Sequence, residues 1–272
     1  MGNQPLAMQE IQQISLQVLK TISRICEEQG FRYTLAFGTL IGAIRHKGYI
    51  PWDDDVDILM PRPDYERFLI YLQNNPIENI DFINWHKSPR CVNGITRVFD
   101  NRYRVVEDIF GDYGLGVFVD VYPVDGLGNE LDSARSVNSY AIGLADIVVD
   151  VTRKDTHVWK KAHSSMGRLK QWLIFRYRKL KGHRYYLSQL QEYAMSRPFE
   201  DYKYVGNINW TWLPLCFERE WFNDLIKVPF EDGEFCIVKE YDSMLRQQYG
   251  DYMQLPPEDK RVYHHCYTAI KK

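Results

Sequence analysis

The sequence predicts an α/β (α+β) fold with a mixed sheet, flanking helices and a largely helical C-terminal half. Strand-like and helix-like patterns alternate as far as about residue 127, which favours a mixed sheet over a purely parallel one. After about residue 128 the periodicity becomes mainly helical. A chain of 272 residues with 45% hydrophobic and 26% charged residues has an ordinary globular composition. Its net charge of -2 gives no general reason to expect nucleic-acid binding, and we expect none.

Helices and strands alternate at the start of the chain. Apolar side chains recur at helical spacing over residues 8–28, which predicts an amphipathic helix. A strand over residues 31–37 and a short helix over 40–45 are expected next. A strand over 55–60 then leads into a helix over 63–72, which opens at a proline.

Three strand-like runs complete the first half. Residues 79–85 form one, and residues 95–99 with 105–106 are expected to form a hairpin. Residues 117–122 form the third, which we expect to end at Pro123 because proline cannot donate a hydrogen bond to a neighbouring strand.

The second half begins with helices. Helical periodicity is present over residues 133–150, 156–177 and 185–195. We therefore divide the chain into a core region over 1–127 and a mainly helical region over 128–272 that packs on it.

One part of the helical region is strongly basic. Residues 153–184 contain eleven Lys and Arg residues and a single acid, with aromatic and aliphatic residues between them. Either these charges form a solvated helix face over an ordinary core stripe, or they rest on an anionic membrane or grip an anionic substrate.

The chain is expected to be cytoplasmic. Its five cysteines are scattered and show no metal-ligand spacing, as is usual for thiols in a reducing compartment. The longest apolar run, residues 140–151, contains two aspartates and is shorter than the ~20 residues needed to cross a bilayer. The protein is thus expected to be soluble or to lie on the inner face of the cell membrane rather than in it.

A pair of acids dominates the chemistry of the sequence. In the strand predicted at Asp55-Val56-Asp57-Ile58, side chains two apart point to the same face, so Asp55 and Asp57 project side by side. Two carboxylates this close repel each other unless a positive group lies between them. Oxygen-only ligands favour Mg²⁺ or Mn²⁺, so we expect one of these ions here.

A glycine turn and a basic cluster precede the acids. Gly38 would let the backbone approach a phosphate, Thr39 could donate its hydroxyl, and a helix that starts there would offer free N–H groups. Arg45, His46 and Lys47 could hold phosphate oxygens or a departing nucleotide; the alternative for each is ordinary loop charge.

The turn and the acids together resemble the opening of the nucleotidyltransferase superfamily, which usually adds a third carboxylate on a neighbouring strand. The resemblance points to Asp120, which could complete a metal site or accept the proton of an attacking hydroxyl. The alternative is that Asp120 only caps the following turn. Asp125, in Asp125-Gly126, is typical of a turn residue.

The whole string over residues 37–60 closely resembles the LicD family, as do residues 118–126 and 249–257. The resemblance implies metal-dependent transfer of a phospho-group from a cytidine-nucleotide donor to a sugar hydroxyl, with CMP as the leaving group. For LicD proteins the donor is CDP-choline. The acceptor is a teichoic-acid or lipopolysaccharide sugar, commonly on a polyprenyl-linked precursor at the cytoplasmic membrane face.

The resemblance also implies roles for residues. Asp55 and Asp57 would be metal ligands and Asp120 the third acid, within a nucleotidyltransferase-like catalytic core over 1–127. Residues 128–272 would bind donor or acceptor. Asp53 and Asp54 would support the ligands or be plain loop residues. Weaker assignments at the phosphate site or over it are Arg97, His264 and His265.

Choline recognition calls for aromatic faces around the quaternary ammonium group. Trp210 and Trp212 are the first residues to test for this role, although such residues also serve as ordinary core. Three alternatives to phosphocholine transfer stay open: transfer of another phospho-alcohol such as ribitol phosphate, transfer of a nucleotidyl group, and a non-catalytic module that binds nucleotide or sugar.

Overall fold

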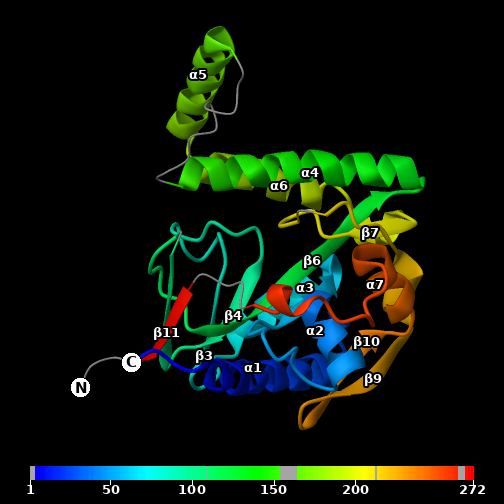
Figure 1. Ribbon diagram of the computed structural model, residues 1–272. Coiled ribbons are helices and arrows are strands. Elements are labelled where there is room, and N and C mark those ends of the chain that lie inside the picture. The colour runs from blue at the N-terminus through cyan, green and yellow to red at the C-terminus, as the bar shows by residue number, and fades with distance from the viewer. Residues whose placement is uncertain (1–3, 109, 154–163, 212, 263–266) are drawn as a thin grey trace.

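A seven-stranded mixed sheet forms the centre of the molecule (Figure 1). The computed structural model describes residues 4–108, 110–153, 164–211, 213–262 and 267–272. The strand order is β1-β2-β6-β4-β3, and β7 and β8 extend the sheet from the second half of β6. Of these pairings, β2 with β6 is parallel and the others are antiparallel, so the predicted mixed sheet is confirmed. The strands are β1 (Thr34–Leu35), β2 (Asp57–Pro61), β3 (Ile80–Ile83), β4 (Thr96–Asp100), β6 (Val117–Gly128), β7 (Tyr204–Gly206) and β8 (Phe217–Glu218).

Helices cover the sheet from two sides. In Figure 1, α1 lies below the sheet, while α4 and α6 lie above it and α5 projects beyond them. The predicted first helix is confirmed; it ends at Gly30, whose φ of 66° is the left-handed conformation favoured at a helix C-terminus. The helices are α1 (Met8–Gln29), α2 (Phe37–Ile41), α3 (Arg62–Asn74), α4 (Leu131–Thr152), α5 (Ser165–Lys181), α6 (His183–Met195) and α7 (Tyr241–Tyr249).

The segment before the acids differs from the prediction. The strand expected over 31–37 is limited to β1, and the helix begins at Phe37 rather than at residue 40. It continues into a π-helical turn, Gly42–His46. Such turns interrupt α-helices mostly at functional sites.

Strand β6 is longer than predicted and runs through Pro123 to Gly128. Pro123 lies between Val121, which pairs with β4, and Asp125, which pairs with β7. The missing N–H therefore falls in the gap between two partner strands, where it costs no ladder hydrogen bond. The turn expected at Asp125 is wrong, because Asp125 is a fully buried strand residue.

The predicted hairpin over 95–106 is also wrong. Strand β4 pairs with β3 and β6, whereas β5 (Tyr103–Glu107) turns away and pairs with β11 (Tyr267–Lys271) near the end of the chain. The sequence could not indicate this partner, since the two strands are far apart along the chain.

The second half adds more than helices. A two-stranded sheet of β9 (Leu225–Phe230) and β10 (Gly233–Val238) packs beside β1 and α1. Among the described residues, no helix is both long and apolar enough to cross a bilayer. The four described cysteines are free thiols.

Candidate functional site

Two of the predicted acids lie side by side in the sheet. Asp57 of β2 is in register with Asp120 of β6, and the Asp120 N–H donates to the Val56 carbonyl at 2.8 Å. Neighbouring strands are about 4.8 Å apart, so residues in register on a parallel pair project from the same face. Val56 and Ile58 face the other way, into the main core, as the alternation predicts.

Asp55 lies just outside the sheet, because β2 begins at Asp57 and not at residue 55. It still acts on the pair electrostatically. Burial raises the pKa of Asp120 to about 6; the guanidinium of Arg97 opposes this shift, and the carboxylate of Asp55 adds to it. Asp55 and Asp120 are thus close enough for the charge of one to disfavour the charged form of the other.

Arg97 extends the row of charges to a third strand. It lies in β4, in register with Asp120, and its Nε donates to Asp120 Oδ1 at 2.8 Å. Its Nη1 donates to Glu107 Oε1 and contacts the Tyr113 hydroxyl, each at 2.5 Å. This guanidinium is largely buried among its partners, so in the structure Arg97 is paired with Asp120 and Glu107 and does not face an open phosphate site.

The Gly38-Thr39 pair holds the acids in place. Thr39 is buried in the first turn of α2, and its Oγ1 accepts a hydrogen bond of 2.9 Å from the Asp57 N–H. A Cβ at Gly38 would lie 2.5 Å from Asp53 Oδ2, so the glycine gives room to this carboxylate. Phe37 has a φ of 49°, a strained value for a bulky residue.

A cavity of about 240 Å³ opens beside Asp57. Four aromatic side chains contribute to its wall, together with Thr211, Leu213, Leu215 and Gln248; the aromatic residues are Phe37, Tyr122, Trp210 and Tyr249. Trp210, predicted from the sequence, therefore lies at the acid site and at the same time packs in a core cluster with α4 and α6. Trp212 lies outside the described residues.

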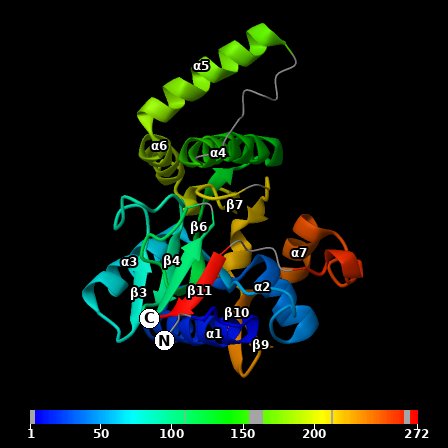
Figure 2. The ribbon, with the colours of Figure 1, turned by 60° about the vertical axis from the view of Figure 1, so that its left-hand side comes forward.

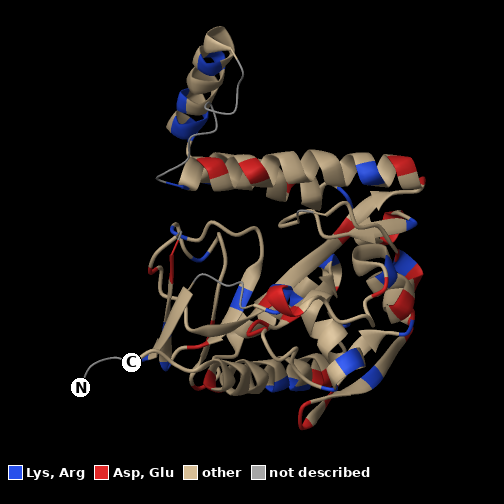
Figure 3. Ribbon diagram, in the orientation of Figure 1, with Lys and Arg blue, Asp and Glu red and all other residues tan. Residues whose placement is uncertain are grey.

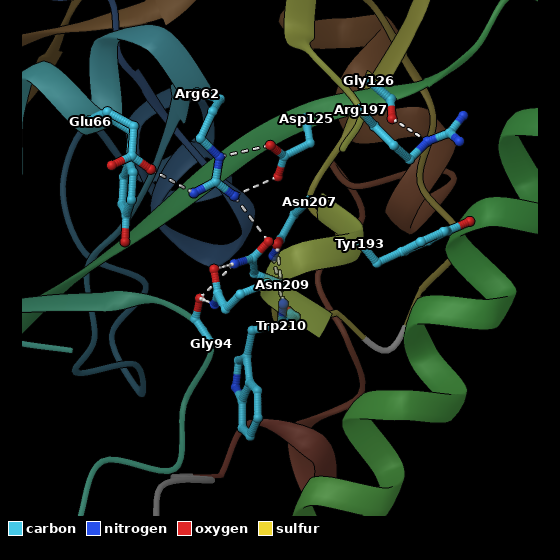
Figure 4. Close-up of polar contacts among 12 residues, drawn as sticks. Arg62, Glu66, Gly94, Asp125, Gly126, Tyr193, Arg197, Asn207, Asn209 and Trp210 are labelled. Carbon is cyan, nitrogen blue, oxygen red and sulfur yellow. Dashed lines mark hydrogen bonds and ion pairs between the residues drawn. The ribbon is translucent and has the colours of Figure 1, made fainter. Parts of the chain in front are cut away.

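Buried hydrogen bonds fix the segment that carries Trp210 (Figure 4). The Asn207 side chain donates to the Trp210 carbonyl at 2.7 Å and accepts from the Trp210 N–H at 3.2 Å. Asn209 donates to the Gly94 carbonyl at 3.1 Å and accepts from Arg62 at 3.0 Å. A network of this kind sets the position of the indole from several elements at once.

Asp125 belongs to the same network and not to a turn. Its two carboxylate oxygens accept from Nε and Nη2 of Arg62, each at 2.7 Å (Figure 4). Burial raises the pKa of Asp125, and the Arg62 guanidinium opposes the shift. This buried pair ties α3 to β6, and Arg62 also connects it to Asn209 of the Trp210 segment.

Tyr249 connects the acid site to a second cavity. Partial burial, and after it the carboxylates of Asp57, Asp55 and Asp53, raise the pKa of its hydroxyl. Tyr249 also lines a neighbouring cavity of about 410 Å³, together with Arg45. Two adjoining spaces, one acidic and aromatic and one with a cation, therefore meet at this side chain.

The predicted basic cluster is only partly brought to the site. Arg45 reaches the second cavity, where its Nη1 donates to the Tyr252 carbonyl at 2.6 Å. His46 accepts from Arg45 Nε at 2.9 Å and stands edge-to-face with Trp52. Lys47 is exposed, with a φ of 61°. Arg45 is thus the member of the cluster that lines a cavity adjoining the acid site.

Other predicted residues lie elsewhere. Asp54 is buried and accepts a hydrogen bond from the Tyr267 hydroxyl of β11, which gives it a structural contact. His264 and His265 lie outside the described residues.

The acid site suits a hard divalent cation that is shared with a substrate. Within the described part of the chain, no group of three or more His, Cys, Asp or Glu side chains is arranged as a complete metal site. Mg²⁺ is usually held by one or two carboxylates together with substrate phosphates, and Asp57 and Asp120 form such a pair. The mutual repulsion of the acids also favours a cation.

Three aromatic residues of the cavity wall were not singled out from the sequence: Phe37, Tyr122 and Tyr249. A signal existed for Tyr122, which follows Asp120 by two positions in a strand and so shares its face. Burial, with the charges of Asp57, Asp120 and Asp55, raises the pKa of its hydroxyl. Tyr249 has no such alternation signal, since it lies at the end of α7; it opens the stretch 249–257 that resembles the LicD family.

Known proteins are similar to this chain both in the segment that carries the acids and over nearly its full length. Residues 30–120 match the family described as LicD/FKTN/FKRP, nucleotidyltransferase domain. The chain is 29% identical over 288 aligned residues to the lipopolysaccharide cholinephosphotransferase LicD of Haemophilus influenzae, covering 97% of this chain and 98% of that protein. An uncharacterized protein of Rickettsia typhi is 38% identical over 52 residues, or 19% of this chain and 17% of its own length.

Proposed function

Because this chain belongs to the LicD family, we propose that it is a transferase that moves phosphocholine from CDP-choline to a sugar hydroxyl of a cell-surface glycan. The leaving group is CMP. The match to a lipopolysaccharide cholinephosphotransferase extends over nearly the full length of both chains, which supports the same class of reaction here.

One observation carries the choice of phosphocholine: Asp57, next to Asp120 in the sheet, and an aromatic wall share one cavity. Four aromatic residues line the space together with Asp57. A quaternary ammonium group is attracted to such rings, while the diphosphate of the same donor needs a cation held by carboxylates. The donor molecule contains both groups, so one cavity can serve both.

The acids would hold the metal and manage the proton. Asp55 and Asp57, with Asp120 beside them, would hold Mg²⁺ or Mn²⁺, which would neutralise charge on the donor's diphosphate. Asp120 Oδ1 is engaged by Arg97, which leaves Oδ2 to accept the proton of the sugar hydroxyl. The sugar oxygen then forms its bond to the phosphorus of phosphocholine as the bond from that phosphorus to the CMP oxygen breaks.

The second cavity suits the rest of the donor. Arg45 and Tyr249 both line this cavity, so the positive charge of Arg45 would face the phosphate of a departing CMP. The acceptor is a glycan of the lipopolysaccharide or teichoic-acid type, free or on a polyprenyl carrier, whose reactive group is a sugar hydroxyl.

A donor panel tests the proposal. The purified chain is incubated with Mg²⁺, a glycan acceptor and either CDP-choline, CDP-ribitol or CDP-glycerol, and CMP release and phosphocholine incorporation are measured. We expect both products with CDP-choline, loss of both on addition of EDTA, and recovery with excess Mg²⁺. Turnover of CDP-ribitol with none of CDP-choline would contradict the choice of alcohol. Full activity in EDTA would contradict the role of the acids.

A further inference from the structure

Helix α5 stands apart from the rest of the molecule. It lies on the far side of α4 and α6 from the sheet in both views (Figures 1 and 2). The structure describes all of α5, and within it only Phe175 is buried. A helix with so little buried surface adds little to the core, although it carries many apolar side chains.

These apolar side chains form one exposed row. Leu173, Tyr177 and Leu180 follow one another at spacings of four and three, which places them on one side of the helix. Met166 and Leu169 continue the row toward the N-terminus. Exposed fractions reach 76% at Met166 and 84% at Leu180. At 3.6 residues per turn, the one buried side chain of the helix lies on the opposite side, so the row points away from the protein.

The helix is also strongly basic. It has six positive side chains and no acid. In Figure 3, α5 lies above α4 and carries blue bands but no red ones. Lys170, Arg176 and Lys181 flank the apolar row on its two sides. Arg168, Arg178 and Lys179 project toward the side of the helix that carries Phe175. Two copies of α5 packed through their apolar rows would bring like charges together, which disfavours self-association as the use of this face.

We propose that α5 is a docking helix for an anionic membrane surface. It would lie in the plane of the interface, with the row from Met166 to Leu180 among the acyl chains and the basic side chains against lipid phosphates. Exposed apolar patches rimmed by polar groups mark sites of this kind, and the uniform positive charge selects a bilayer with negative head groups.

Docking through α5 would orient the site. Trp210 packs in one cluster with Val148 and Val151 of α4 and with Tyr186 and Leu187 of α6, and α5 contacts both of these helices. The layer between membrane and sheet would therefore be the one that backs the aromatic wall, which brings the donor cavity near the lipid surface. This orientation suits an acceptor attached to a lipid; it rests on the proposed function, whereas the docking itself does not.

Vesicle co-sedimentation of the full chain tests the docking. The probes are phosphatidylglycerol-rich vesicles and, as reference, vesicles of phosphatidylcholine alone. We expect the partition coefficient on anionic vesicles to exceed that on neutral ones by roughly tenfold or more, and to fall steeply with added salt.

A matched pair of variants distinguishes vesicle binding through α5 from non-specific binding through other exposed apolar side chains. Leu173→Ser with Leu180→Ser should reduce binding to anionic vesicles by roughly tenfold or more, because exposed side chains are removed from the inserted face. Ile70→Ser removes a side chain that is 56% exposed on α3 and should leave binding unchanged. CMP release from CDP-choline with a water-soluble acceptor should be the same in the native chain, the α5 variant and Ile70→Ser. Loss of vesicle binding can then be distinguished from loss of transferase activity.

Two results would overturn the proposal. One is equal recovery with neutral and anionic vesicles, or binding that does not change in the α5 variant. The other is a concentration-dependent dimer that the α5 variant abolishes, in a chain that does not bind vesicles; this would assign the row to a second copy.

Discussion

The acid row and the aromatic wall, which meet at Asp57, are built in different ways. The row consists of Asp57, Asp120 and Arg97 on three neighbouring strands, held in line by backbone register. The wall is gathered from four separate segments of the chain, at Phe37, Tyr122, Trp210 and Tyr249. Strand pairing fixes the row, whereas the wall combines Tyr122 of β6 with residues from α2, from the end of α7 and from the Trp210 segment, which side-chain hydrogen bonds hold.

The proposed function links the row to the reaction itself and the wall to the choice of donor. Under the proposed function, the acids would act on the phosphate groups that every CDP-alcohol shares, while the wall would meet the alcohol that distinguishes one donor from another. Substitutions in the row should thus abolish the reaction for all donors. Substitutions in the wall should instead change the ranking of donors.

The largest expected effect comes from Asp57→Asn. Loss of this charge should lower kcat/KM by about 10³-fold for every donor, since electrostatic stabilisation of phosphoryl transfer depends on the carboxylates. The melting temperature should stay level or rise, because one of three repelling acids becomes neutral. Asp132→Asn, at an exposed acid of α4, is the control and should change neither quantity. Retained activity in Asp57→Asn would break the distinction between row and wall.

Arg97→Gln tests whether the row depends on its cation for stability. The variant leaves the buried carboxylates of Asp120 and Glu107 without their common partner, and the free energy of unfolding should fall by about 3–5 kcal/mol in urea titrations. Arg104→Gln removes an arginine from a half-exposed pair with Asp112 and should cost about 0–1 kcal/mol. Equal costs for the two variants would show that the row is not held by charge.

Asn207→Ala tests the support of the wall. The Trp210 N–H and carbonyl would both lose their partner inside the protein, which should cost about 1–3 kcal/mol of stability. The KM for CDP-choline should rise by several fold while Mg²⁺ binding is kept. Asn75→Ala, at an exposed side chain that bonds to the Tyr71 carbonyl, serves as control. An unchanged KM in a destabilised Asn207→Ala protein would mean that the segment does not position the indole.

The two acids of the row were predictable from the sequence, whereas the pairing of Arg97 with Asp120 was not. Alternation along Asp55-Val56-Asp57 and along the strand around Asp120 predicts two acidic faces, and the parallel pairing of β2 with β6 brings them together. The buried faces of α1 and α3 follow from helical periodicity in the same way. Local patterns suffice for these features because each one depends on a few consecutive residues.

The errors arise where tertiary partners override local signals. The Asp125-Gly126 pair is typical of a turn, yet Arg62 compensates the buried carboxylate and the strand continues. The hairpin at β4 and β5 failed because β5 pairs with the distant β11. The turn expected at Gly38 is the start of α2, which begins one residue earlier, at Phe37. The same holds for Tyr249 in the site, because no local periodicity predicts that α7 ends beside the acids.

The most direct test of the central claim is the donor preference of Tyr249→Leu. The quantity measured is the ratio of kcat/KM for CDP-choline to kcat/KM for CDP-ribitol, in the native protein and in the variant. Leucine keeps apolar bulk at this half-exposed position but removes the ring face, so the ratio should fall roughly 5- to 30-fold, the equivalent of about 1–2 kcal/mol of cation–π attraction. Tyr140→Leu, at an exposed tyrosine of α4, should leave the ratio unchanged. A ratio that stays constant in Tyr249→Leu, or a loss of the same size for both donors, would contradict an aromatic wall that reads choline.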